Sequence, residues 1–298
     1  MNAESRIRRE ARNHLSNNNW GKAIAITILL ASIPVVLSYI NHLLAGLFSL
    51  NAIDLSLLSR HLFDQKLVDE AVRNVTEPNA WIYSAALAVL LLVIFVASWP
   101  LQLGVTYWSY QVANGKSVTF GEIFRYYKAE RLFIHAMRFY FHYMIRIFLW
   151  SLLFLLPGSI LTGISSQLNL LYAAKGIPTM VGLFVPIGMV LSIVGAIALI
   201  PIAFRYFLAP YFAVMDDKSN EVQCIKLSWQ TMEGRRIDLL KLLITFIPWG
   251  LLCFFVIPVL YVAPYFYISM ANCAKWLIYE KDKKEQKREA EYYTAASL

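Results

Sequence analysis

Apolar residues in this chain occur in long blocks rather than in the short alternating runs of a half-buried strand. About 20 helical residues are needed to cross the hydrocarbon core of a bilayer. Six blocks of roughly this length are predicted as spans, at residues 23–47, 80–107, 147–171, 180–204, 239–256 and 259–277. This pattern predicts an all-α, polytopic transmembrane helical bundle of about six spans, accompanied by amphipathic interfacial helices.

Polar segments flank these blocks and divide the chain into three parts. We expect a basic N-terminal segment at 1–21, a membrane domain at 22–279 and a charged tail at 280–298. The first apolar run is longer than the 7–15 residues of a signal-peptide core, so we interpret it as a retained span. A tight turn is expected at Ile257-Pro258, between the last two spans.

Prolines interrupt several of the predicted spans. We expect Pro157, Pro210 and Pro264 to kink their helices, since proline cannot donate the helical hydrogen bond. The pentapeptides at 208–212 (LAPYF) and 262–266 (VAPYF) form a weak internal repeat. Paired proline-interrupted segments can mark a transporter site, but we favour a recurrent device for kinking a helix and anchoring it.

Two polar segments have a helical apolar face. Residues 54–75 are predicted to form a helix on the membrane surface opposite the termini. Residues 219–233 are predicted to form a cytoplasmic amphipathic helix, with Ser219 as its N-cap and Gly234 as its stop.

Composition agrees with a membrane protein. Of the 298 residues, 58% are hydrophobic and 15% are charged, and the mean hydropathy is +0.53. A soluble domain has about 45–50% apolar and 25% charged residues, so a single soluble core is excluded. Cys224, Cys253 and Cys273 have no paired spacing and imply no disulfide framework.

Basic residues alternate along the chain and predict its orientation. Clusters lie before the first span, between the second and third, between the fourth and fifth, and in the C-terminal tail, whereas the alternate segments contain few. The positive-inside rule then places both termini in the cytoplasm. The net charge of +8 is explained by this topology and gives no reason to expect nucleic-acid binding.

The segment before the third predicted span carries a stripe of basic residues. Spacings of three and four place them within a narrow arc at about 100° per residue. The stripe consists of Lys128, Arg131, His135, Arg138, His142 and Arg146. We expect residues 120–145 to run along the membrane or at a steep tilt, with the third span beginning near Ile147, because an upright helix would bring Arg146 close to the bilayer centre.

Two interpretations of this basic stripe stay open. Its arginines can extend to the headgroups from an interfacial helix, or the stripe can line a cationic groove that binds lipid phosphates or another anion. A metal site at His135 and His142 is not expected, because no cysteine or carboxylate joins them on that face.

Motifs for chemistry are absent. The chain has no GxGxxG, Walker A, HExxH or GxSxG sequence. Asp216-Asp217 is interpreted as a solvated pair at a cytoplasmic span end. We therefore expect no cofactor and no enzymatic activity.

Several short motifs in a fixed order resemble one family. They include Asn19-Trp20, the stretch TFGEIF at 119–124, Pro157-Gly158, Met232-Glu233-Gly234 and Ala263-Pro264-Tyr265. Together they resemble the bacterial multi-pass membrane proteins numbered 975 in the series of domains of unknown function. The chain is also distantly similar to the membrane domain of some glycerophosphodiester phosphodiesterases.

This resemblance covers nearly the whole chain. It implies a helical integral protein of the bacterial cytoplasmic membrane and supplies no catalytic residues. The stretch 158–203 is longer here than the family's usual linker and contains the predicted fourth span.

The function expected from these observations is a membrane-embedded binding or scaffold component that contacts anionic membrane lipids through the basic stripe. The alternative is a transporter or channel for a small or amphiphilic solute. A lipid-filled lateral groove would favour the first function, and a deep polar cavity would favour the second.

Overall fold

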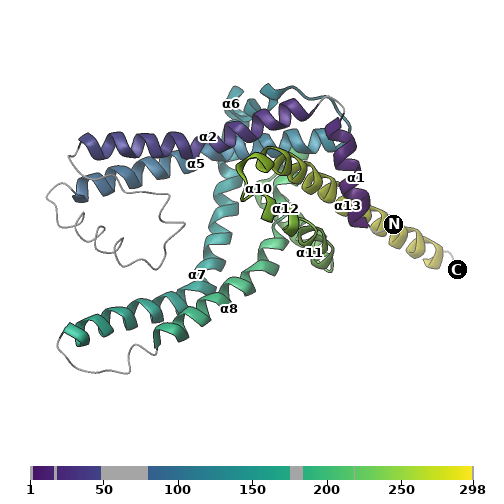
Figure 1. Cartoon of the computed structure of the whole chain (residues 1–298). Coiled ribbons are helices and arrows are strands. Elements are labelled where there is room, and N and C mark those ends of the chain that lie inside the picture. Colours follow the sequence, from purple (N-terminus) through teal and green to yellow (C-terminus); the bar gives the residue numbers. More distant parts are fainter. Residues whose placement is uncertain (1–2, 17–18, 48–79, 175–183, 218, 297–298) are drawn as a thin grey trace.

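Two long helical hairpins extend from a cluster of the remaining helices in this computed structural model (Figure 1). It describes residues 3–16, 19–47, 80–174, 184–217 and 219–296. Within these ranges all regular structure is helical, which confirms the predicted all-α fold. Both termini lie at the end of the molecule that carries the cluster.

The first hairpin pairs α2 (Trp20–Leu47) with α5 (Ala80–Ala113). Far from the termini, the two helices are joined by a buried hydrogen bond of 2.6 Å from the Tyr83 hydroxyl to Asn41 Oδ1. A small apolar cluster of Ala45, Tyr83 and Leu87 surrounds this bond. Burial in an apolar setting strengthens such a bond, so it fixes the register of the hairpin.

The second hairpin pairs α7 (Glu130–Ala174) with α8 (Phe184–Arg205), and glycines allow the close approach. A Cβ atom at Gly158 would lie 2.6 Å from the backbone nitrogen of Ser192, and one at Gly188 would lie 2.7 Å from that of Thr162. Small residues are the usual means by which membrane helices pack closely. The close packing of α7 on α8 therefore requires glycine, which has no Cβ atom, at both positions.

α7 changes direction along its length (Figure 1). Its first part runs crosswise to α2 and α5, and its second part runs beside α8. α7 is a single helix of 45 residues, so the stripe segment and the predicted third span are continuous.

The cluster at the termini contains the remaining helices. They are α1 (Ala3–Ser16), the 3-10 helix η1 (Phe120–Phe124), α6 (Arg125–Lys128), α9 (Ala209–Met215), α10 (Glu221–Thr231), α11 (Arg236–Ile244), α12 (Ile247–Leu252) and α13 (Val256–Ala296). The apolar core joins α1, the last turns of α5, α11 and α13. Its members include Ile7, Leu15, Trp108, Met232, Leu242 and Ile268.

η1 packs on α5 at a glycine. A Cβ atom at Gly104 would lie 2.7 Å from the carbonyl carbon of Ile123, whose side chain is fully buried. Thr119 precedes η1 as expected, although its side chain makes no capping bond. Gly104 is thus required for the segment after α5 to fold back on it.

Five helices in the described ranges are long and apolar enough to cross a membrane, and the chain is a multi-pass integral membrane protein. They are α2, α5, α7, α8 with α9, and α13.

The stretch expected as a fifth span, 239–256, instead forms α11 and α12, separated at Thr245 and Phe246. The turn before α13 lies at 253–255 rather than at Ile257-Pro258. The predicted helix at 54–75 and the start of the fourth span, at 180–183, lie outside the described residues.

The three prolines occupy different positions. Pro157 lies inside α7 and Pro264 inside α13. Pro210 lies in the first turn of α9, directly after the break that follows α8, where a missing N–H costs nothing. The helix predicted at 219–233 forms as α10, but its N-cap is Asn220 rather than Ser219, and the Asn220 side chain accepts from the Val222 N–H at 3.0 Å. Gly234, with φ +73°, follows the end of α10.

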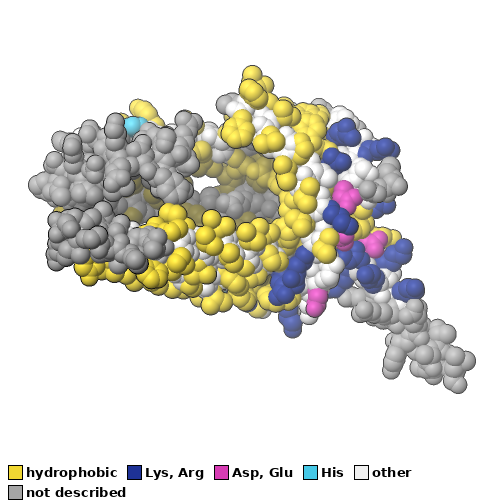
Figure 2. Space-filling view, turned by 60° about the horizontal axis from the view of Figure 1, so that its bottom comes forward, with side chains coloured by type: hydrophobic (Ala, Val, Ile, Leu, Met, Phe, Trp, Pro, Cys, Tyr) yellow, Lys and Arg dark blue, Asp and Glu magenta, His cyan; other side chains and the backbone are white. Residues whose placement is uncertain are grey.

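Apolar side chains cover the two hairpins, and charged side chains gather at the end with the termini (Figure 2). Figure 2 also shows a hollow, and the described side chains along its border are mostly apolar. Val35, Val89, Leu153 and Val190 are among the exposed apolar residues of α2, α5, α7 and α8. An apolar surface of this extent is stable only against lipid.

Candidate functional site

Most of the basic stripe lies on α7, as its spacing predicts. Arg131, His135, Arg138 and His142 follow one another along the first part of that helix, and Arg146 comes next. Lys128 does not belong to it, because Ala129 is extended, with φ −133° and ψ 130°, and separates α6 from α7. Lys128 instead lies 3.9 Å from Glu122.

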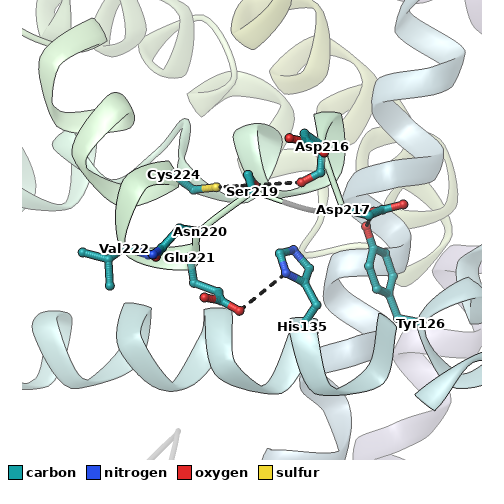
Figure 3. Close-up of polar contacts among 9 residues, drawn as sticks. All are labelled: Tyr126, His135, Asp216, Asp217, Ser219, Asn220, Glu221, Val222 and Cys224. Carbon is teal, nitrogen blue, oxygen red and sulfur yellow. Dashed lines mark hydrogen bonds and ion pairs between the residues drawn. The ribbon is translucent and has the colours of Figure 1, made fainter. Parts of the chain in front are cut away.

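The two edges of the stripe face different neighbours. At about 100° per residue, His135 and Arg146 lie on one edge and Arg138 on the other. His135 is buried against α10, where its Nδ1 atom lies 3.6 Å from Glu221 Oε1 (Figure 3). Arg131 and Arg138 are exposed. The structure therefore divides the stripe instead of presenting one continuous cationic surface.

An open groove of about 860 Å³ lies between α5 and α7. Its walls are almost entirely apolar, and Arg138 and His142 are its basic members. The other lining residues are Leu92, Phe95, Val96, Trp99, Met137, Phe141, Met144, Ile145, Ile147, Phe148 and Ser151. Such a groove combines room for a hydrocarbon chain with positive charge beside it.

A second pocket, of about 550 Å³, lies where the other edge of the stripe meets α10. Arg146 and Lys226 line it together with Glu233, Tyr206, Val222, Ile225, Trp229 and Gln230. The Nη1 atom of Arg146 is buried and has no hydrogen-bond partner among the residues that the structure describes. This pocket is the more polar of the two.

Aromatic side chains support the second pocket. The guanidinium carbon of Arg205 lies 4.2 Å from the centroid of the Trp229 ring, a cation–π distance. The Trp150 indole donates to the Tyr206 hydroxyl at 3.0 Å. α7, α8 and α10 are thereby held around Arg146.

An anchor that the sequence did not indicate lies next to the stripe. Arg125 of α6 pairs with Asp217, and the Tyr126 hydroxyl donates to the same carboxylate at 3.2 Å. The Arg125 guanidinium also lies 4.4 Å from the Tyr107 ring centroid. Asp217 is therefore a structural partner rather than one of a solvated pair. No local pattern links residues so far apart along the chain.

The pKa values of Arg125 and Tyr126 reflect their part-buried contact with Asp217. Burial raises the pKa of the Tyr126 hydroxyl, and the Asp217 carboxylate raises it further. For Arg125, burial acts to lower the pKa, but the attraction of Asp217 and its tyrosine neighbours outweighs it and raises the pKa. Both donors stay protonated and hold the segment between α9 and α10.

Metal-ligating residues do not cluster in the part of the chain that the structure describes. No group of three or more His, Cys, Asp or Glu side chains suited to a metal ion occurs among the described residues. Cys224 is buried with its Sγ atom 3.0 Å from Ser219 Oγ, and burial raises the pKa of its thiol (Figure 3). A thiol of raised pKa is a poor ligand and a poor nucleophile.

Comparison with known proteins identifies the family. The family described as "Protein of unknown function (DUF975)" matches residues 1–281, which is nearly the whole chain. No curated protein and no solved structure matches the chain. The motif order noted in the sequence, the all-α fold and this match agree, and the chain belongs to the DUF975 family.

Proposed function

We propose that the protein is a non-enzymatic, membrane-embedded binding or scaffold component, and that it holds an anionic lipid in the groove between α5 and α7. The observation that carries this proposal is the groove itself. Its walls are almost entirely apolar, it is open rather than enclosed, and Arg138 and His142 are its basic residues. This combination matches a lipid, which has hydrocarbon chains and a phosphate at one end.

The direction of α7 supports the proposal. If α2 and α5 cross the bilayer, the first part of α7, which runs crosswise to them, lies along the interface. Exposed Arg131 and Arg138 are then at headgroup depth, where a basic residue contributes about 1 kcal/mol near an anionic leaflet. The groove then lies at the depth of the acyl chains, where each buried methylene contributes about 0.8 kcal/mol to the free energy of lipid binding.

The cytoplasmic membrane of a bacterium, with both termini inside, is the location we propose. The basic clusters of the chain lie before α2, between α5 and α7, between α9 and α11, and after Trp276, and positive charge is retained on the cytoplasmic side. α1 packs on α13, so both ends of the chain lie at one end of the molecule.

Lipid retention measured by native mass spectrometry tests the proposal. Arg138→Gln should reduce copurification of anionic lipid about fivefold, the effect of about 1 kcal/mol. Lys128→Gln, which removes an equal charge away from the groove, is the matched control and should have little effect. Equal losses in the two variants would refute a specific groove.

The apolar part of the groove needs its own variant. Val96→Trp fills the groove and should reduce the retention of all lipids, whereas Leu153→Trp, on an exposed face of α7, should not. If Val96→Trp retains as much lipid as the unmodified protein, the acyl chain does not occupy the groove.

A transporter or channel for a small or amphiphilic solute is the second candidate. One observation favours it, the more polar pocket that contains Arg146 with an unpartnered, buried Nη1 atom. Flux of an anionic solute in proteoliposomes that is abolished by Arg146→Gln but unaffected by Arg138→Gln would favour transport over lipid binding.

A further inference from the structure

α11, α12 and α13 form a hairpin whose tip is its most exposed apolar part. α11 and α12 approach the tip, the chain turns at 253–255, and α13 returns. At the tip the exposed fractions are 85% for Phe254, 71% for Phe255 and 82% for Ile257. Three large apolar side chains at one tip are unfavourable in water, and lipid is the partner that their chemistry fits.

Three contacts locate this hairpin relative to the rest of the fold. Lys275 Nζ donates to the carbonyl of Ala113, the last residue of α5, at 3.1 Å. The ring of Tyr261 stacks on Trp20, the first residue of α2, at 4.9 Å between centroids. Arg235, which precedes α11, lies 3.6 Å from Glu280. The contacts of Arg235 and Lys275 place the base of the hairpin at the end of the molecule with the termini, and the contact of Tyr261 places the first turns of α13 beside the start of α2.

The hairpin is too short to reach the other end. From Lys275 back to Ile257 is eighteen residues, about 27 Å of helix at 1.5 Å per residue. From Ala113 back to Trp81 is thirty-two residues, about 48 Å. Since Lys275 and Ala113 are in contact, the tip ends about 20 Å before the far end of α5.

Packing agrees with this difference in length. The core cluster that contains Tyr265 and Ile268 of α13 includes α5 residues only from Leu101 onward. At the far end, buried Tyr83 and Leu87 cluster, among the described residues, only with residues of α2 and α5. Figure 1 likewise shows α2 and α5 continuing well past the point where α13 begins.

The backbone N–H groups of the turn have hydrogen-bond partners within the chain, as an apolar medium requires. The N–H groups of Cys253, Phe254 and Phe255 donate to the carbonyls of Gly250, Leu251 and Leu252 at 3.1, 3.3 and 3.1 Å. Backbone groups without partners are costly in lipid. At the break between α11 and α12, the Thr245 hydroxyl donates to the Leu242 carbonyl at 2.6 Å, and the Phe246 N–H donates to Leu243 at 2.9 Å.

We propose that this hairpin is a re-entrant wedge that inserts Phe254, Phe255 and Ile257 among the acyl chains of the leaflet nearest the termini and does not cross the bilayer. Only α2, α5, α7 and α8 then cross. Four crossings keep both termini on one side, as six would, so the distribution of basic residues is satisfied equally well. Among the five long apolar helices of the described ranges, α13 is the least apolar and the most buried, as a helix packed in protein should be.

The wedge does not depend on the lipid groove, and its position can be measured directly. In a background with Cys224, Cys253 and Cys273 replaced by serine or alanine, single variants Phe255→Cys, Trp81→Cys and Lys283→Cys are made. Each is treated with a membrane-impermeant maleimide in vesicles of both orientations. Trp81→Cys should react only from the side opposite the termini and Lys283→Cys only from the termini side, while Phe255→Cys should react from neither.

A second measurement excludes simple occlusion by protein. A bimane label at Phe255→Cys should be quenched by lipids brominated on their acyl chains at least twofold more strongly than the same label at Lys283→Cys. Reaction of Phe255→Cys from the Trp81 side would show a full crossing and overturn the wedge. Absence of quenching would place the tip outside lipid and overturn it equally. Ile257→Cys repeats the test if the first variant does not fold.

Discussion

The imidazole of His135 on α7 lies 3.6 Å from the carboxylate of Glu221 on α10, and this contact turns one member of a basic stripe inward. The two side chains are 7% and 18% exposed. When the imidazole is protonated the contact is an ion pair in a medium of reduced polarity, where removal of one partner costs more than a surface pair is worth.

The first prediction concerns this contact. Glu221→Ala should destabilise the docking of α10 on α7 by about 1–3 kcal/mol, because the buried imidazole of His135 loses its partner. Thermal unfolding in detergent measures the change. His135→Gln should cost a similar amount, and the double variant should cost less than the sum of the two single variants. Additive losses would show that the two side chains do not interact.

Close packing between α7 and α8 leads to the second prediction. Gly158→Ile should destabilise the hairpin by about 1–3 kcal/mol, since its side chain would overlap the backbone at Ser192. Gly163, on the same helix, has no atom within 4 Å of its would-be Cβ, so Gly163→Ile is the matched control and should be nearly neutral. Unfolding followed by tryptophan fluorescence distinguishes the two. Equal destabilisation would mean that α7 and α8 do not pack at Gly158.

The third prediction is a dependence on pH. Burial lowers the pKa of His14 below its ordinary 6.5, and Lys275 lowers it further, while Glu10 acts in the opposite sense. A detached α1 therefore binds a proton more readily than a docked one. The contribution of neutral His14 to docking is present above about pH 6.5 and is lost as the pH falls below that value.

Hydrogen exchange measures this effect. After correction for intrinsic rates, the amides of α1 should exchange faster at pH 5.5 than at pH 7.5, and the difference should be smaller in His14→Gln. Amides of α8 provide the internal reference. An equal difference in the variant would assign the pH dependence to another group.

Local sequence patterns predict many of the helices of this protein, because the hydropathy and the helical periodicity of a segment depend only on neighbouring residues. The apolar blocks at 23–47, 80–107 and 180–204 correspond to α2, α5 and α8, and the spacing from Arg131 to Arg146 correctly predicts one helical face. Gly234 ends the α10 region with the left-handed backbone that its position after a helix indicates.

The sequence by itself determined an all-α, multi-pass membrane protein, since hydropathy acts residue by residue. Only the tertiary structure decided how the stripe is divided, because two helices, α5 and α10, pack on opposite edges of it. It also joined Arg125 to Asp217, a pair that no local pattern connects. The break between α11 and α12 is likewise a tertiary outcome. The apolar stretch at 239–256 is interrupted at Thr245 and Phe246, whose backbone N–H groups bond to carbonyls of α11. The α13 helix that follows packs in the core with the last turns of α5.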